Sequence, residues 1–439
     1  MENFFPEILI TYLLPFRQAF SKPGFGYFQG FIAALLLSQG RKCISHIANT
    51  CFFIDKSLSS FERFLASAKW DLPQVTQHLI GLLIKQLGQA LLYAGRYVVA
   101  VDTTFAQKVK GRMQGVQRWT ENSQNPKRKT SVVGHHWGIA GLLHRIGQRW
   151  QCLPVMTKLI SGQNHPSHFV VDEHGQAARQ TFWDAVLALV LSVSASLVGA
   201  PVVVVADAYF GKAPFLNPLI AHAIGVVSRL RWDAVGFDDP IYCGRGRRPK
   251  KGKKWKLAQL LEQFPRQTVV ATIYGKTVEM GVVVRDIWLR DVKKKVRIVV
   301  IDGVNRPILL VSTALSLTAG QIIEIYAARF ALEIAIRDLK QHLGFCDYQS
   351  TTTIAFLRFT QLCCCALCIG RLILGQKESL PWLQHDPSGA VSESAFSFAT
   401  LRRGLRRFVV KRLLFDKSAE SADLKKCQKE LDAIVRIAA

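Results

Sequence analysis

Acidic side chains are scarce in this 439-residue sequence. Asp and Glu together number 31, against 57 Lys and Arg, so the chain carries a net charge of +26 at neutral pH. A field of this size disfavours cationic partners and concentrates polyanions near the surface. Nucleic acid is the polyanion that this charge favours first, and an anionic membrane is the second. A basic surface without a specialised partner is the remaining interpretation.

The sequence also lacks a signal peptide after Met1 and a regular cysteine framework. Its ten cysteines are irregularly spaced, which fits a reducing cytoplasm. Cys365 and Cys368 form a C-x-x-C pair, but no second pair stands at zinc-ligand spacing nearby. Both lie in the apolar run FTQLCCCALCIG, which indicates small side chains buried on a helix.

One uncharged stretch, residues 185–206, is long enough to cross a bilayer. Gly199 and Pro201 divide it, so its first part predicts a helix and the run VVVV predicts a buried strand. We therefore expect no membrane as a partner. A membrane-associated protein is an alternative that depends on this stretch alone.

Secondary-structure patterns divide the chain into parts. Residues 1–95 predict a helical region, with helix starts at Ser59 or Ser60 and at Asp71. Residues 96–232 and 318–348 predict a catalytic core. Its first part orders β-β-β-α-β-α-β, with strands at 97–105, 135–144, 149–160, 201–207 and 224–231 and helices near 178–198 and 214–223. This order is that of an α/β fold with one mixed sheet covered by helices.

The region 233–317 has a different pattern. Strand-like runs follow the basic stretch IYCGRGRRPKKGKKWK, which predicts a β-rich insertion with a basic loop at its entrance. A helix is then expected to begin near Thr318 and to carry YAARFALEIAIRDLKQHLGF, residues 326–345. Residues 349–439 predict a helical and basic C-terminal region.

Three acids stand at informative positions. Asp102 and Asp207 each follow a run of buried strand residues, and Glu333 lies in the middle of the predicted helix. Each has an ordinary explanation, namely a strand-end cap for the aspartates and helix ion pairs with Arg329 and Arg337 for the glutamate. Together they offer hard oxygen ligands for two Mg²⁺ or Mn²⁺ ions beside one sheet edge, which is the chemistry of phosphodiester cleavage.

The helix face around Glu333 carries a spaced signature. Tyr326, Arg329, Glu333 and Lys340 are separated by two, three and six residues. This pattern resembles the DDE transposases of bacterial insertion sequences, in the branch marked by a Tyr-Arg-Glu-Lys signature. The resemblance implies a ribonuclease-H-like core with flanking helical regions, of which the N-terminal one binds DNA. It implies that Asp102, Asp207 and Glu333 are catalytic and bind two divalent ions.

The resemblance also implies partners. Tyr326, Arg329 and Lys340 are expected to contact DNA phosphates, and Trp232 is a candidate for holding a flipped base. The stretch GRGRRPKK resembles a minor-groove hook, which adds as DNA contacts the residues Arg245, Arg247, Arg248, Lys250 and Lys251. Transposon ends and target are double-stranded DNA, a homodimer is expected in the synaptic complex, and the bacterial cytoplasm at the nucleoid is the expected location.

The leading hypothesis is therefore a cut-and-paste transposase, which is both an endonuclease and a strand transferase. A decayed or domesticated DNA-binding protein is one alternative. A metal-dependent nuclease without strand transfer is another, because the same site would serve both reactions.

Overall fold

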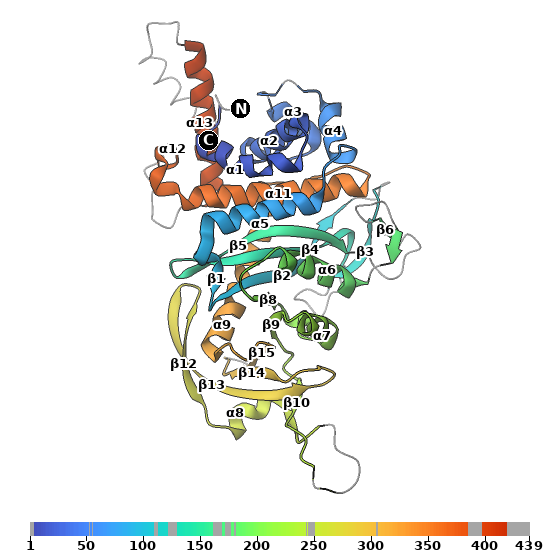
Figure 1. Ribbon diagram of the computed structural model, residues 1–439, viewed down its shortest axis with the longest axis vertical. Helices are drawn as coiled ribbons and strands as arrows, with labels where there is room; N and C mark the ends of the chain where they lie inside the picture. Colours follow the sequence, from blue (N-terminus) through green and yellow to red (C-terminus); the bar gives the residue numbers. More distant parts are fainter. Residues whose placement is uncertain are drawn as a thin grey trace.

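The computed structural model of the chain has a helical layer at one end, a long sheet across its middle and further strands at the other end (Figure 1). The structure describes residues 4–51, 53–54, 56–108, 113–121, 130–160, 169–171, 177–179, 181–242, 244, 251–303, 306–384 and 397–418.

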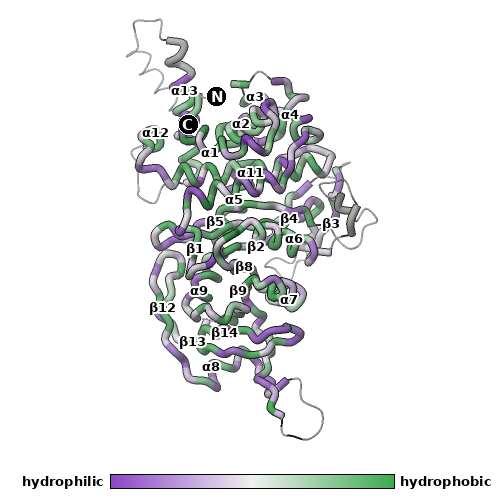
Figure 2. Tube along the Cα trace, viewed as in Figure 1, coloured by the Kyte–Doolittle hydropathy of each residue, from purple (hydrophilic) through white to green (hydrophobic). Residues whose placement is uncertain are grey.

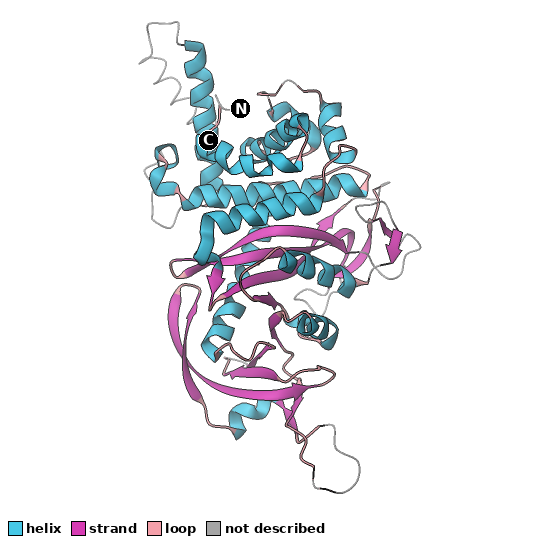
Figure 3. Ribbon diagram, viewed as in Figure 1, coloured by secondary structure: helices cyan, strands magenta, loops and turns pink. Residues whose placement is uncertain are grey.

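Five strands form the centre of the sheet (Figure 3). They are β2 (Arg96–Gln107), β4 (Thr130–Ile146), β5 (Arg149–Ile160), β8 (Val202–Ala206) and β9 (Gly225–Arg229). Across the sheet they run in the order β5-β4-β2-β8-β9; the first three are antiparallel, and β8 and β9 are parallel to β2. This mixed order is that of a ribonuclease-H-like core and confirms the predicted α/β fold class.

Helices supply the crossovers that parallel strands require. Helix α6 (Phe182–Ala195) precedes β8 and begins with a capping box between Thr181 and Asp184, and α7 (Ala213–Ala221) joins β8 to β9. Gly199, at φ +90, lies between α6 and β8. The predicted division of the uncharged stretch into a helix and a buried strand is confirmed.

The strands of the region 233–317 extend the same sheet. Strand β15 pairs antiparallel with β9, and β14 and β13 follow outward, so one sheet of 13 strands results. These strands are β10 (Val235–Phe237), β11 (Lys254–Lys256), β12 (Gln267–Ile273), β13 (Lys276–Leu289), β14 (Val296–Ile301) and β15 (Ile308–Ser312). The short helix α8 (Leu260–Gln263) lies between β11 and β12.

The remaining strands are short. They are β1 (Leu92–Tyr93) and β3 (Gln117–Glu121), which join the large sheet, and the separate pair β6 (Phe169–Val171) and β7 (Ala177–Arg179).

The N-terminal and C-terminal helices pack together at one end of the molecule (Figure 1). They are α1 (Glu7–Leu13), α2 (Lys22–Leu37), α3 (Ile44–Thr50), α4 (Leu58–Ala66), α5 (Leu72–Leu87), α11 (Thr353–Gly375), α12 (Pro381–Gln384) and α13 (Phe398–Ser418). Helices α11 and α5 lie over β5, and α1 to α4 lie on the other side of α11 (Figure 1). Buried Arg358 of α11 donates to the carbonyls of Leu65 and Trp70, and Arg402 of α13 donates to those of Leu36 and Ser38. Two regions at opposite ends of the sequence are therefore joined through buried arginines.

The long helix α11 is apolar on nearly all sides (Figure 2). A helix with this pattern belongs in a core or a membrane. Among the described residues it is the one helix long and apolar enough to span a bilayer, and 83% of its most apolar window is buried inside the molecule. Cys365 and Cys368 are fully buried on it, as predicted, and neither forms a disulfide.

The segment that carries Tyr326, Arg329, Glu333 and Lys340 forms two helices. Thr318 caps α9 (Ala319–Ala328) through reciprocal bonds with Gln321, which confirms the predicted start. Helix α10 (Phe330–His342) follows, and Arg329 between them keeps helical dihedrals of φ −51 and ψ −35. The segment predicted as one helix is therefore divided into α9 and α10 at Arg329, although the backbone of that residue stays helical.

A buried ion pair fixes the far side of α10. Arg371 of α11 contacts Asp338 of α10 at 2.7 Å, with side-chain exposures of 5% and 12%, and also donates to the carbonyl of Cys152 on β5. Because α10, α11 and β5 meet at this guanidinium, the ion pair sets where the opposite face of α10 lies.

Replacing Arg371 by Met should destabilise the chain by about 3–5 kcal/mol, because Asp338 is left as a buried carboxylate without its counter-ion. Urea unfolding measures this loss. The double variant Arg371→Met with Asp338→Leu should lose less. Arg266→Met, which breaks the exposed pair with Asp302, should change stability by less than about 1 kcal/mol. Equal losses at the buried and exposed pairs would contradict the assignment.

Candidate active site

Asp102 and Asp207 stand at the same edge of the sheet. The register of the parallel strands β2 and β8 ends with Ala100 paired to Val205. Asp102 lies two residues beyond Ala100, and Asp207 lies two residues beyond Val205. Asp207 has just left β8 and caps a short 3-10 helix. Asp102 does not end its strand, since β2 continues along β4 to Gln107, but the pairing with β8 ends before it.

Backbone N–H groups hold both aspartates. The N–H of Thr103 lies 2.7 Å from Oδ1 of Asp102, and the N–H of Tyr209 lies 2.9 Å from Oδ1 of Asp207. These bonds fix the orientation of both carboxylates and leave the other oxygen of each for further partners.

Glu333 approaches this edge from the first turn of α10. It reaches the aspartates through Arg329, whose Nη2 lies 2.6 Å from Oε1 of Glu333 and whose Nη1 lies 3.1 Å from Oδ2 of Asp102. The side chains of Arg329 and Asp102 are 17% and 19% exposed, and that of Glu333 is 42% exposed. The helix ion pair considered from the sequence exists, and it extends to an acid on a different element.

Burial dominates the electrostatics of the two aspartates. It raises the pKa of Asp102 from 3.8 to about 6, against the Thr103 N–H and the Arg329 guanidinium, while Asp207 and Glu333 raise it further. Burial likewise raises the pKa of Asp207, with the Tyr209 N–H and Arg329 opposing it and Glu333 adding to it. Since Asp207 and Glu333 both raise the pKa of Asp102, and Glu333 raises that of Asp207, the three carboxylates form one electrostatic unit.

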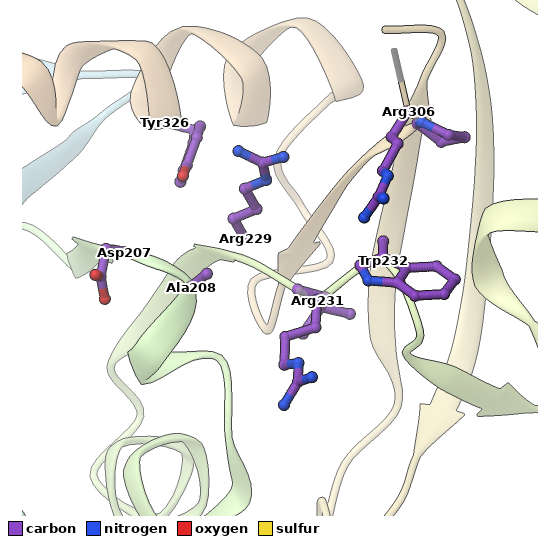
Figure 4. A pocket seen from close by; sticks show the side chains of 9 residues that line it. Asp207, Ala208, Arg229, Arg231, Trp232, Arg306 and Tyr326 are labelled. Atoms are coloured by element: carbon purple, nitrogen blue, oxygen red, sulfur yellow. The ribbon is translucent and has the colours of Figure 1, made fainter. Parts of the chain in front are cut away.

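A cationic pocket of about 410 Å³ adjoins Asp207 (Figure 4). Arg229, Arg231 and Arg306 line it together with the predicted residues Tyr326 and Trp232. Arg229 ends β9, and its guanidinium lies beside the Tyr326 side chain in this view. None of the three arginines was predicted from the sequence. Arg229 comes directly after a run of buried strand residues, as Asp207 does, and this is the one local signal that could have marked it.

The residues predicted to contact nucleic acid lie at different places in the structure. Trp232 is 57% exposed, with the guanidinium carbon of Arg306 at 5.2 Å from its ring centroid. Lys340 donates to the carbonyl of Phe105 at 3.0 Å, so it reaches the strand that carries Asp102. Arg337 lies 3.9 Å from Asp338, and among the described residues no ion pair joins it to Glu333.

Most of the predicted minor-groove hook lies outside the described residues, namely Arg245, Arg247, Arg248 and Lys250. Lys251 is described, and its Nζ lies 4.6 Å from the ring centroid of Phe237 on β10.

A protein-family model described as a DDE superfamily endonuclease matches residues 15–276, which is more than half of the chain. The chain belongs to this superfamily. The match includes Asp102 and Asp207 and ends before Glu333. No curated protein matches the chain. Membership supports a nuclease of the transposase type and DNA as its substrate.

DDE superfamily nucleases usually act with divalent metal ions. The donor set here fits such ions in its chemistry, because Asp102, Asp207 and Glu333 all supply hard oxygen ligands. A cation already stands among them, since the Arg329 guanidinium bridges Asp102 and Glu333. As placed, no three His, Cys, Asp or Glu side chains in the described part of the chain are close enough to hold an ion. We assign this separation of the carboxylates to the guanidinium of Arg329, which lies between Asp102 and Glu333.

Asp102→Asn should stabilise the chain at about pH 8, by up to about 3 kcal/mol, because a pKa moved from 3.8 to about 6 corresponds to that free energy. The gain should shrink as the pH falls through 6 and vanish near about pH 4, because the penalty for the ionised carboxylate is complete above the folded-state pKa and absent below the unfolded-state pKa of 3.8. Urea unfolding at several pH values measures this. The exposed control Asp302→Asn should show no such trend, and a pH-independent gain at Asp102 would contradict the prediction.

Proposed function

We propose that the chain is a cut-and-paste transposase of the Tyr-Arg-Glu-Lys branch, from a bacterial insertion sequence. It binds transposon ends, cleaves phosphodiester bonds and joins the 3′-hydroxyl ends to target DNA. One observation carries the proposal: Asp102, Asp207 and Glu333 come from two adjacent strands and one helix and share a single electrostatic site. A phosphodiester fits this arrangement as substrate. The net charge of +26 attracts a polyanion, and the scarce acids gather at one site.

In this proposal the three carboxylates hold two Mg²⁺ or Mn²⁺ ions. When bound there, the ions supply Lewis-acid activation of the attacking oxygen and charge stabilisation at the leaving oxygen. The residues of the chain orient the substrate. Arg229 and Tyr326 stand beside Asp207 at the mouth of the pocket, where they can hold a phosphate against the acids.

Trp232 remains the proposed stacking surface for a base. It is well exposed, and Arg306 lies over its ring, so a base stacked on it would meet both an aromatic face and a cation. Lys340 and Arg329 complete the proposed phosphate contacts. Arg245, Arg247, Arg248, Lys250 and Lys251 are proposed to bind DNA as well. We also propose that two copies of the chain act in the synaptic complex, in the bacterial cytoplasm at the nucleoid.

A nuclease without strand transfer is the second candidate, because the geometry of the acids serves hydrolysis equally well. A plasmid carrying the reading frame with its native flanks distinguishes the two. Excision of the flanked segment followed by its integration elsewhere supports the transposase, whereas cleavage without joined products supports the nuclease.

Asp102→Ala, Asp207→Ala or Glu333→Ala should each reduce metal-dependent DNA cleavage by about 1,000-fold or more, because residues that act as a unit fail together. DNA binding should persist, since the basic residues that supply it are unchanged. Product gels and mobility shifts measure the two properties. Asp302→Ala is the control and should cleave normally. A variant of one site acid that cuts at the wild-type rate would remove that acid from the site.

Arg229→Ala and Lys340→Ala should weaken DNA binding and lower the slope of log K against log salt by about 1 each, because each removes one phosphate contact. Binding isotherms at several salt concentrations measure this. Arg337→Ala, on the same helix as Lys340 and 60% exposed, is the matched control. An unchanged slope would exclude the residue from the phosphate contacts.

A further inference from the structure

One guanidinium occupies the centre of the acid site. Arg329 donates to Asp102 on β2 and to Glu333 on α10, and its side chain is 17% exposed. It makes both bonds from a position between two helices, at the residue that separates α9 from α10. The two acids that come from different elements are therefore connected by a resident cation.

This cation competes with any divalent ion for the same oxygens. Asp102 and Glu333 would both supply oxygens to a bound divalent ion, and Arg329 now engages Oδ2 of the one and Oε1 of the other. A guanidinium and a divalent ion repel at the distances of one coordination sphere, and the guanidinium here is largely shielded from water. Binding of a divalent ion is therefore opposed while Arg329 stays in place.

A DNA phosphate would be an alternative anionic partner for Arg329. Arginine binds phosphate through two parallel N–H donors, as it binds carboxylates. The guanidinium carbon of Arg329 lies 6.0 Å from the ring centroid of Tyr326, and Tyr326 lines the cationic pocket beside Asp207. A phosphate bound in that pocket would therefore lie on the side of Arg329 that faces Tyr326.

We propose that Arg329 is an internal counter-ion that closes the acid site until DNA phosphate withdraws it, so that metal ions and DNA bind cooperatively. This inference rests on the proposed function, because it takes the three acids as the metal ligands. Without DNA the site is neutralised by the chain itself and holds divalent ions weakly. With DNA the guanidinium moves to phosphate, and the carboxylates become available.

Metal binding to the full-length chain without DNA tests the proposal directly. Mn²⁺ titrations followed by electron paramagnetic resonance should give an affinity about tenfold or more tighter for Arg329→Gln than for wild type, within the usual range of coupled sites. Arg337→Gln is the matched control, since it stands four residues after Glu333 where Arg329 stands four before. Its Mn²⁺ affinity should equal that of wild type.

DNA supplies the second arm of the experiment. A pre-cleaved duplex with the sequence that flanks the reading frame should raise the Mn²⁺ affinity of wild type, and Mn²⁺ should raise DNA affinity by the same factor. In Arg329→Gln this coupling should be largely lost. If Arg329→Gln does not fold, Arg329→Lys replaces it, and its single point charge should leave Mn²⁺ affinity between the two extremes.

The outcomes separate the inference from the function on which it rests. Equal Mn²⁺ affinities for wild type and Arg329→Gln, both abolished by Asp102→Asn, would overturn the counter-ion role and leave the acids as metal ligands. Mn²⁺ binding that survives Asp102→Asn in every background, with and without DNA, would place the ion elsewhere and overturn the proposed function as well.

Discussion

The parallel register of β2 and β8 is the constraint on which the site depends. It brings two carboxylates to the same edge of the sheet at the end of a fully buried strand, where ionisation is opposed by burial and by the neighbouring charge. The fold accepts this arrangement because backbone N–H groups bind both aspartates and one guanidinium serves Asp102 and Glu333 together. The position of α10, which brings that guanidinium, is therefore as important as the sheet itself.

Helix α10 separates two kinds of ion pair on different faces. Glu333 and Asp338 are five residues apart and point about 140° away from each other around the axis. Asp338 is buried against Arg371, which also binds the backbone of β5, so this face is fixed to the scaffold. Glu333 is more exposed and pairs with an arginine four residues before it. A rigid far side and a more accessible near side are what a site needs if its counter-ion is to exchange while its acid stays in place.

Local patterns predicted the elements and not their long-range partners. A few neighbouring residues determine the strand runs, the Thr318 cap and the break at Gly199 and Pro201. Each of these features has a local physical cause. The joining of β15 to β9, which makes the region 233–317 part of the main sheet, depends on a register that no local pattern encodes. The same holds for the three arginines of the pocket and for the bond from Arg329 to Asp102, whose residues lie 227 positions apart.

Helix ion pairing and an active site were competing explanations for Glu333, and the geometry makes them compatible. An ordinary pair between residues four apart is worth only a few tenths of a kcal/mol when exposed. Here the same pair is half-buried and is completed by Asp102, so the arginine neutralises acids that burial would otherwise penalise. The pair is then the resting state of the site. A cation that replaces the guanidinium must carry at least its positive charge. An anion that draws the guanidinium away must bind it as strongly as the two carboxylates do. A divalent ion and a DNA phosphate meet these two requirements together, and neither meets both alone.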